Sequence, residues 1–243
     1  MVQTAPPIAA PAAPAAPGDA APTAAAAQAP PSSPPDPATL YPDSDGQPMA
    51  ENTLQYRWIV RLVSNLQRLL QDQVAFVAGD LLWYPVEVDQ PPVPSIAPDA
   101  LVVLGRPAGD RGSYKQWQEE DMAPQVVFEI ISPSNTIKEM LEKQKFYGQY
   151  GVLEAFFYNP ETQDFMGLVR ATPQDTFTLL MALELPWTSP TLGIRFELGA
   201  ELEVFYPNGE KFKDPIEFAQ ERDQFAQERD QFAQERDQFA QER

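Results

Sequence analysis

The chain of 243 residues contains no cysteine and no histidine. Without cysteine there is no disulfide framework and no zinc or iron–sulfur site with thiolate ligands. Without histidine there is no imidazole acid or base, no Ser-His-Asp triad and no His-ligated metal. Catalysis would therefore depend on Asp, Glu, Lys, Ser, Tyr or Arg, and a bound metal would be a hard cation held by oxygen.

Positive charge and long apolar runs are also scarce. Lys and Arg number 17 against 35 Asp and Glu, which gives a formal net charge of −18. This balance argues against a protein that coats nucleic acid, because such proteins neutralise phosphates with basic side chains. No apolar run reaches the roughly 20 residues that a membrane span needs, so we expect no membrane-crossing segment.

Residues 1–44 are dominated by two residue types, with 12 Pro and 15 Ala. Pro removes backbone donors, and Ala buries too little surface to offset the entropy of ordering, so the composition predicts a disordered tail. Prolines also interrupt the early apolar stretches, which disagrees with a signal peptide and favours a cytoplasmic protein. The composition favours a passive extension over a tether or a partner ligand.

Residues 208–243 contain a perfect seven-residue repeat, Phe-Ala-Gln-Glu-Arg-Asp-Gln, starting at Phe218 and repeated from Phe225 and Phe232, with a partial copy at Phe239. This period places the phenylalanines on one stripe of a helix. A strong coiled coil has two apolar positions per heptad, whereas this repeat offers Phe with only Ala beside it. Two interpretations stay open: a coiled coil that self-associates or binds a partner through 218–243, and a solvated helix produced by duplication.

Residues 45–207 have the composition of one globular domain with its own core. Periodicity and turn residues predict helices at 54–70 and 136–150, the second with Ser134 or Asn135 as N-cap, and a short helix near 114–120. The expected strands are 74–84 (with a turn at 79–80), 100–104, 125–131, 155–158, 165–169, 176–180 and 201–206. This order predicts an α/β domain with a mixed central sheet.

Three residues break the pattern. Glu129 lies inside an otherwise apolar strand, where a carboxylate is costly unless it is paired or bound to a cation. Asp99 stands at the entrance of the strand 100–104 and would meet Glu129 if the two strands were neighbours. Lys143 shares a helix face with Met140, Tyr147 and Tyr150, so its ammonium group would either reach water or point into a site.

Two carboxylates and a lysine can form a hydrolytic centre without histidine. The carboxylates would hold Mg²⁺ or Mn²⁺, which polarises a phosphodiester and lowers the pKa of a bound water. The lysine would orient that water or stabilise developing negative charge. In the alternative, Asp99 caps a turn, Glu129 pairs with an arginine and Lys143 is a surface residue.

Five segments in order resemble the Uma family of restriction endonuclease domains, in the PD-(D/E)xK nuclease superfamily. They are Tyr-Pro-Asp-Ser-Asp-Gly-Gln-Pro-Met-Ala-Glu at 41–51, Ala-Pro-Asp-Ala-Leu-Val-Val at 97–103, Val-Val-Phe-Glu-Ile-Ile-Ser-Pro-Ser at 126–134, Glu-Lys-Gln-Lys-Phe-Tyr at 142–147 and Tyr-Gly-Val-Leu-Glu at 150–154. The resemblance extends from about Tyr41 to Tyr206. It implies the restriction-endonuclease-like fold, a mixed central sheet flanked by helices, and a metal-dependent nuclease site.

The resemblance also implies roles for particular residues. Asp99 and Glu129 match the two metal carboxylates and Lys143 the catalytic lysine, while Glu51 matches an acidic residue that helps to hold metal. The more usual lysine position, two residues after the glutamate, is Ile131. Gln55 stands where many relatives carry histidine.

The resulting functional hypothesis is a DNA endonuclease that uses Mg²⁺ or Mn²⁺. A local groove containing Lys115 and Lys145 would contact nucleic acid despite the net charge. A homodimer is compatible with this hypothesis. The alternative is a catalytically inactive nuclease fold that serves as an interaction or scaffold module through its C-terminal helix.

Overall fold

A six-stranded mixed sheet forms the centre of the computed structural model, which describes residues 37–241; most of the expected tail at 1–44 and the last two residues lie outside the described residues. Its strands are β1 (Ala75–Ala78), β3 (Ala100–Leu104), β5 (Val126–Ile130), β6 (Glu154–Asn159), β7 (Asp164–Val169) and β8 (Thr178–Met181), in the order β1-β3-β5-β6-β7-β8. Neighbouring strands are antiparallel except β5 and β6, which are parallel. A parallel pair needs a crossover, which the helix α3 (Ile137–Gln149) supplies.

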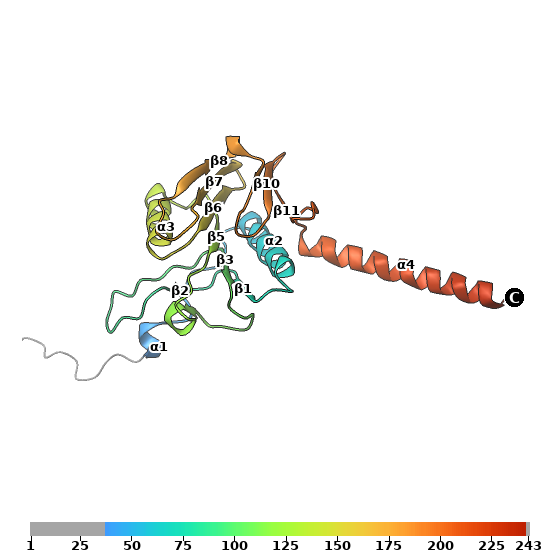
Figure 1. Cartoon of the computed structure of the whole chain (residues 1–243), viewed down its shortest axis with the longest axis horizontal. Coiled ribbons are helices and arrows are strands. Elements are labelled where there is room, and N and C mark those ends of the chain that lie inside the picture. The colour runs from blue at the N-terminus through green and yellow to red at the C-terminus, as the bar shows by residue number, and fades with distance from the viewer. Residues whose placement is uncertain (1–36, 242–243) are drawn as a thin grey trace, which may run out of the picture. The chain divides into compact units, whose positions relative to one another are not determined.

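The two main helices cover opposite faces of this sheet (Figure 1). The helix α2 (Thr53–Leu69) begins at Asn52, whose side chain accepts a hydrogen bond from the Gln55 backbone N–H at 2.8 Å. Strand residues alternate between the faces, so Val126 and Phe128 pack on the α2 side and Val127 on the α3 side. By the same alternation Glu129 belongs to the α3 side of the sheet.

A small second sheet lies on the α2 side. It contains β9 (Trp187–Thr188), β10 (Arg195–Leu198) and β11 (Leu202–Phe205), all antiparallel. Phe196 of β10 is buried, and its ring centroid lies 4.6 Å from that of Phe156 and 5.4 Å from that of Phe165. The aromatic cluster around Phe196 therefore joins the second sheet to the central one.

The other short elements are α1 (Pro37–Leu40), a parallel pair of β2 (Trp83–Tyr84) and β4 (Tyr114–Lys115), and the 3₁₀ turns at Gln116–Gln118 and Ala182–Glu184. The described chain ends in its longest helix, α4 (Pro215–Gln241). Among the described residues no helix is long and apolar enough to span a membrane.

The predicted fold class is confirmed: the structure is an α/β domain with a mixed central sheet flanked by helices. Four local expectations differ. The range 114–120, expected as a short helix, begins with the strand β4 (Tyr114–Lys115) and contains only the 3₁₀ turn Gln116–Gln118, and residues 37–40 of the tail expected to be disordered form a short helix. The strands β9 and β10 were not expected, and α3 is capped by Thr136, which forms a capping box with Glu139, rather than by Ser134 or Asn135. The Ser134 hydroxyl donates to Glu51, and Asn135 Oδ1 accepts from the Ser132 backbone N–H, which leaves the cap to the next residue.

The division at residues 44 and 208 stays a prediction, although both boundary regions contain packed residues. Tyr41 is buried, and its hydroxyl donates a hydrogen bond to the Val88 carbonyl at 2.8 Å. Phe212 is also buried, and its backbone N–H donates to the Val204 carbonyl at 2.7 Å. The packed part of the chain thus extends beyond 45–207 at both ends.

Replacing Phe196 with alanine should lower the free energy of unfolding by about 3–5 kcal/mol, because it opens a cavity between the two sheets. Chemical denaturation followed by circular dichroism would measure the loss. Leu183→Ala is the control, since Leu183 is 98% exposed and its truncation should change stability little. Equal effects of the two substitutions would contradict this view of the core.

Candidate active site

Asp99 and Glu129 face each other across neighbouring strands. In the antiparallel pair β3–β5, Ala100 lies opposite Phe128 and Leu101 opposite Val127. Continuing this register by one residue sets Asp99 opposite Glu129, and directly opposed side chains have Cβ atoms about 5 Å apart. The expectation that the two carboxylates meet if their strands are neighbours is met in the structure.

Both carboxylates are buried, with 9% of Asp99 and 2% of Glu129 exposed. The Ile130 backbone N–H donates a hydrogen bond to Asp99 Oδ2 at 2.6 Å. Burial raises the pKa of Asp99 to about 8, and the negative charge of Glu129 adds to this rise, while Lys143 opposes it. Carboxyl pKa values raised by burial and a like charge are frequent at functional sites, and a cation beside the two carboxylates would offset the rise.

Two side chains of α3 hold Glu129. The Lys143 Nζ atom lies 2.5 Å from Glu129 Oε2, and the Tyr147 hydroxyl donates to Glu129 Oε1. Burial lowers the pKa of Lys143, but the charge and hydrogen bond of Glu129 more than offset this effect and raise it overall. Burial, reinforced by the charge of Glu129, raises the pKa of Tyr147. Lys143 is therefore cationic and Tyr147 neutral, and both bind the Glu129 carboxylate.

Glu51 approaches the site from the segment before α2. Its Oε2 atom accepts a hydrogen bond from Ser132 Oγ at 2.6 Å, and its Oε1 atom accepts one from the Ser134 hydroxyl. These two hydrogen bonds, led by that of Ser132, lower the pKa of Glu51. Glu51 thus holds the loop between β5 and α3 in place through both of its carboxylate oxygens.

Gln55 links the same elements. Its Nε2 atom donates a hydrogen bond to the Ile130 carbonyl at 2.9 Å, and its Oε1 atom accepts one from the Glu51 backbone N–H at 2.9 Å. The side chain is buried. A glutamine at this position therefore ties the end of β5 to the start of α2, a role that needs both an amide donor and an amide acceptor.

Asp80 reaches the site because the chain turns sharply at Gly79. A Cβ atom at Gly79 would lie 2.9 Å from Val63 Cγ2 and 3.2 Å from the Asp99 carbonyl oxygen, so only glycine fits. Burial raises the pKa of Asp80, and the charge of Asp45 contributes to the rise. The turn brings a further carboxylate close to Asp99.

These side chains line one cleft of about 490 Å³. Its charged residues are Asp45, Glu51, Asp80, Asp99, Glu129, Glu139 and Lys143. The structure thus places all four predicted catalytic and metal-binding residues in one cleft, with Lys143 as its only basic lining residue among the described residues. Their catalytic and metal-binding roles stay predictions.

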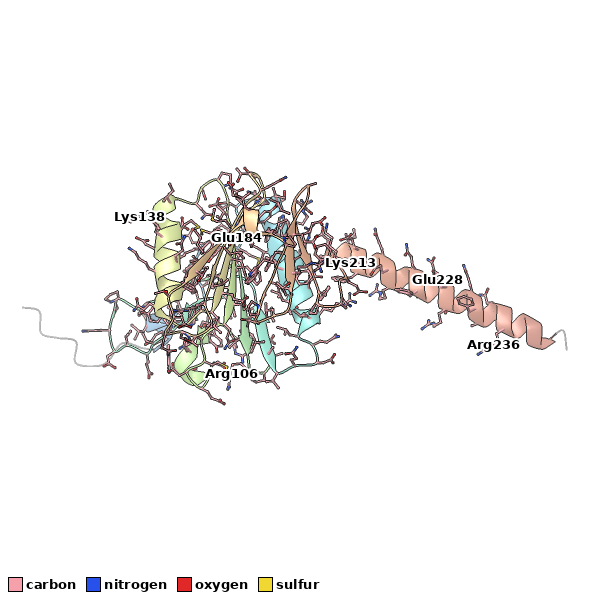
Figure 2. All side chains as sticks on the ribbon, turned by 45° about the horizontal axis from the view of Figure 1, so that its top comes forward. Arg106, Lys138, Glu184, Lys213, Glu228 and Arg236 are labelled. Carbon is pink, nitrogen blue, oxygen red and sulfur yellow. The ribbon has the colours of Figure 1, made fainter. Side chains whose placement is uncertain are left out.

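The two predicted nucleic-acid contacts lie outside the lining of this cleft. Lys115 in β4 has its Nζ atom 5.9 Å from the centroid of the Tyr41 ring, and Lys145 is an exposed residue of α3. Lys138, at the start of α3, is labelled in Figure 2. It pairs with Glu142 at 3.7 Å, and both side chains are largely exposed. A DNA-binding role for Lys115 and Lys145 stays a prediction.

Sequence reasoning did not assign roles to Tyr147, Ser132, Ser134 or Asp80. The sequence does contain a signal for a role of Tyr147 in the site, because Tyr147 lies four residues after Lys143 on the same helix face. Ser132 and Ser134 gave none, since their partner Glu51 lies more than 80 residues earlier in the chain. The alternative in which Glu129 pairs with an arginine and Lys143 lies at the surface is wrong, because these two residues bind each other.

The carboxylates of Asp99 and Glu129 are suitable ligands for a hard divalent cation, although they are only two. Asp99 and Glu129 supply carboxylate oxygens at one place, and Mg²⁺ commonly uses one or two carboxylates and completes its shell with water and substrate phosphate. Within residues 37–241, no group of three acidic side chains is already arranged around a common metal position. A cation here would therefore rest on Asp99 and Glu129, with Lys143 still beside Glu129.

A comparison with curated proteins gives no significant match. Among solved structures, the chain is similar to the crystal structure of a "putative nuclease belonging to DUF820" from Anabaena variabilis, with a TM-score of 0.42, 15% identity, and coverage of 60% of this chain and 77% of that one. Residues 34–203, well over half of the chain, match the family described as "Uma2: Putative restriction endonuclease". The chain belongs to the Uma2 family of putative restriction endonucleases.

Proposed function

We propose that this protein is a DNA endonuclease that hydrolyses phosphodiester bonds with the help of Mg²⁺ or Mn²⁺. Family membership supports a nuclease-type activity. The observation that carries the finer proposal is the opposition of Asp99 and Glu129 across β3 and β5, beside Lys143, in one cleft. A cytoplasmic location and DNA as the substrate belong to the same proposal.

Asp99 and Glu129 would hold the cation, which when bound would polarise the phosphodiester and lower the pKa of a coordinated water. Asp99 is fixed by the Ile130 backbone N–H, so its remaining oxygen is the one that can turn to a ligand. Glu129 is fixed by two donors of α3, one on each oxygen, and each oxygen keeps a lone pair that can bind a cation.

Lys143 would provide the positively charged side chain in the proposed hydrolysis. Its Nζ atom is held by Glu129 Oε2, and its pKa is raised, so it stays protonated at neutral pH. From this position the ammonium group can donate a hydrogen bond to the attacking water or to a phosphate oxygen that gains charge. Its side chain is 17% exposed, which restricts its motion and keeps it directed along Glu129.

Glu51 has a positioning role in this proposal before any role as a ligand. Each of its oxygens accepts a hydrogen bond from a serine hydroxyl group, so a metal contact would use the remaining lone pair of an oxygen that also binds Ser132 or Ser134. In the arrangement that the structure shows, Glu51 fixes the loop that follows Glu129. Metal binding by Glu51 belongs to the same proposal.

A second candidate function is a catalytically inactive nuclease fold that serves as an interaction module. One observation favours it: Phe225 and Phe232 of α4 are 69% and 70% exposed. The acidic lining of the cleft also disfavours the approach of a phosphate backbone unless cations are bound there. Metal-dependent cleavage is the result that separates the two functions.

Incubation of the protein with plasmid and single-stranded DNA in Mg²⁺ or Mn²⁺ should give cleavage that Glu129→Gln and Lys143→Met each reduce. We expect losses on the order of 10²–10³-fold, the usual cost of removing one transition-state stabiliser. Gel analysis of the products measures the rates. The matched controls are Glu142→Gln and Lys138→Met, an exposed pair on the same helix that should leave the rate unchanged.

Absence of cleavage by the wild-type protein on both substrates with both metals, together with absence of metal binding in calorimetry, would refute the enzymatic proposal and leave the interaction module. Equal losses in the control variants would instead show that α3 tolerates no change, and the assignment of Lys143 would fail.

The stability of the metal-free protein should fall as the pH rises from about 4 to about 8. Asp99 has a pKa of about 8 in the folded state against an ordinary 3.8, so in this range the folded state keeps a proton that the unfolded state has lost. The stabilisation is complete below pH 4 and is lost through pH 8, by an amount on the order of a few kcal/mol. Thermal unfolding in the presence of a chelator measures it.

Asp99→Asn should flatten this pH dependence, whereas Asp110→Asn, at an exposed position, should retain it. Addition of Mn²⁺ at pH 8 should raise the unfolding temperature of the wild type, because a cation favours the ionised carboxylate. A wild-type protein whose stability is flat between pH 4 and pH 8 would contradict the assignment of a buried, protonated Asp99.

Tyr147→Phe should weaken Mn²⁺ binding about 10- to 100-fold, the usual effect of removing a hydrogen bond that orients a metal ligand. The variant loses the hydroxyl that holds Glu129 Oε1 and keeps the ring that packs in the core. Calorimetry measures the affinity. Tyr150→Phe is the control, since its hydroxyl makes no hydrogen bond within the described part of the chain; an unchanged affinity in Tyr147→Phe would exclude the positioning role.

A further inference from the structure

The candidate active-site cleft has an apolar part beside its charged part. The charged lining residues include Asp99, Glu129 and Lys143. The apolar lining comes from three separate segments of the chain and consists of Pro48, Met49, Ala50, Leu82, Ile96 and Ala97. Hydrolysis at Asp99 and Glu129 would use the charged part alone, so the apolar part is available to bind another portion of the substrate.

The apolar part is accessible and well fixed. Met49 is 44% exposed, and Ile96 and Ala97 are partly exposed. Ile96 is held by Trp83 through two backbone hydrogen bonds, one in each direction, at 2.7 and 3.2 Å. These side chains therefore keep their place at the cleft and still present apolar surface to a ligand.

The segment 44–50, which carries Met49, is held at both ends. Before it, the Tyr84 hydroxyl donates a hydrogen bond to the Pro42 carbonyl at 2.6 Å. After it, Glu51 accepts hydrogen bonds from two serines of the loop between β5 and α3. The apolar lining thus belongs to the folded cleft.

A nucleotide base is the portion of a DNA substrate that fits such a surface. The cleft volume of about 490 Å³ lies in the range of pockets that enclose one small molecule, about 300–1,000 Å³. In a duplex, the neighbouring base pairs cover both faces of each base. In an unpaired strand, a base can leave the stack and pack against a protein side chain. The apolar lining can therefore contact a base only when the strand is unpaired.

The charge of the cleft favours the same form of substrate. Six carboxylates and one lysine line it. Duplex DNA carries one negative charge per about 1.7 Å of its axis, which is twice the density of one of its strands. The repulsion between this cleft and the phosphates is therefore smaller for a single strand, which can also bend its other phosphates away.

A basic and aromatic surface adjoins the apolar part of the cleft. Leu82 and Ala97 line the cleft. Both also pack in the hydrophobic cluster around Tyr41, as does Trp117. The ring centroids of Tyr41 and Trp117 lie 4.9 Å apart, and Lys115 Nζ lies 5.9 Å from that of Tyr41. Proteins that bind single strands combine basic side chains with aromatic rings, so a strand that leaves the cleft on this side would meet both.

We propose that the substrate of this site is unpaired DNA, with a base beside the scissile phosphate packed against Met49 and Ile96. This inference rests on the proposed nuclease function and deepens it, because it specifies the form of the strand that the site accepts.

Fluorescence anisotropy with labelled oligonucleotides tests the form of the strand. Ca²⁺ replaces Mg²⁺ in this assay, so that binding is measured whether or not the protein cleaves. The full chain should bind a single strand about tenfold more tightly than the same strand in a duplex, since contact with one base is worth about this much. Equal or tighter binding of the duplex would overturn the inference.

Cleavage in Mn²⁺ of a duplex with an unpaired central bubble separates this inference from the nuclease proposal. The cuts should fall within the bubble and not in the paired arms. Cuts at equal rates in the bubble and the arms would overturn the preference and confirm a nuclease. Preferential binding of the single strand without any cleavage would refute the nuclease and support the recognition of unpaired DNA.

Met49→Gln should weaken binding of the single strand about fivefold, because a polar side chain of similar length replaces the apolar contact. Its affinity for the duplex should stay unchanged. Met181→Gln is the matched control, since Met181 is 45% exposed and lies on β8, outside the cleft lining. Circular dichroism checks that both variants are folded. A single-strand affinity of Met49→Gln equal to that of the wild type would overturn the assigned contact.

A strand whose nucleotides lack bases tests the same contact from the side of the substrate. The wild type should bind this abasic strand more weakly than the normal strand. Met49→Gln should bind it as the wild type does, because both changes remove one and the same contact. A further fivefold loss of the variant on the abasic strand would show that Met49 does not contact a base, and would overturn the proposal.

Discussion

The opposition of two buried carboxylates on neighbouring strands is the constraint on which the rest of the site depends. Asp99 and Glu129 lie level with each other on the α3 side of the sheet, and both are largely withdrawn from solvent. Two like charges at this separation in a low dielectric cannot both stay ionised without compensation. In this fold the pKa of Asp99 is raised, and the Lys143 ammonium group binds Glu129.

The helix α3 supplies this compensation because the parallel strands β5 and β6 need a crossover helix over this face of the sheet. The crossover from β5 to β6 must return over one face of the sheet, and that face carries Glu129. Lys143 and Tyr147, one turn apart on the inner side of the helix, then reach the two oxygens of the same carboxylate. Glu51 and Gln55 fix the other end of the arrangement, since they hold the loop and the last carbonyl of β5.

Much of this could be predicted from the sequence, and the exceptions have a common cause. Glu129 was visible as the one carboxylate in an apolar strand, and Lys143 and Tyr147 as neighbours at helical spacing, because these signals are local. The sequence could not show that β3 and β5 are neighbours, since strand order depends on contacts between residues far apart in the chain. The bonds from Ser132 and Ser134 to Glu51 could not be predicted for the same reason. The strands β9 and β10 were missed because they are short and interrupted by turn residues, although Phe196 is central to the core.

The acidity of the cleft is the physical fact that a nuclease must accommodate. Its lining has six carboxylates and one lysine, so a phosphate backbone could approach only with bound cations, and the first of these would rest on Asp99 and Glu129.

The most direct test is anomalous X-ray scattering from crystals grown with Mn²⁺. Our account predicts a manganese peak bridging the carboxylates of Asp99 and Glu129, which disappears in Glu129→Gln. A crystal with no peak at these residues, or with Mn²⁺ bound only at Asp45 and Asp80, would contradict it.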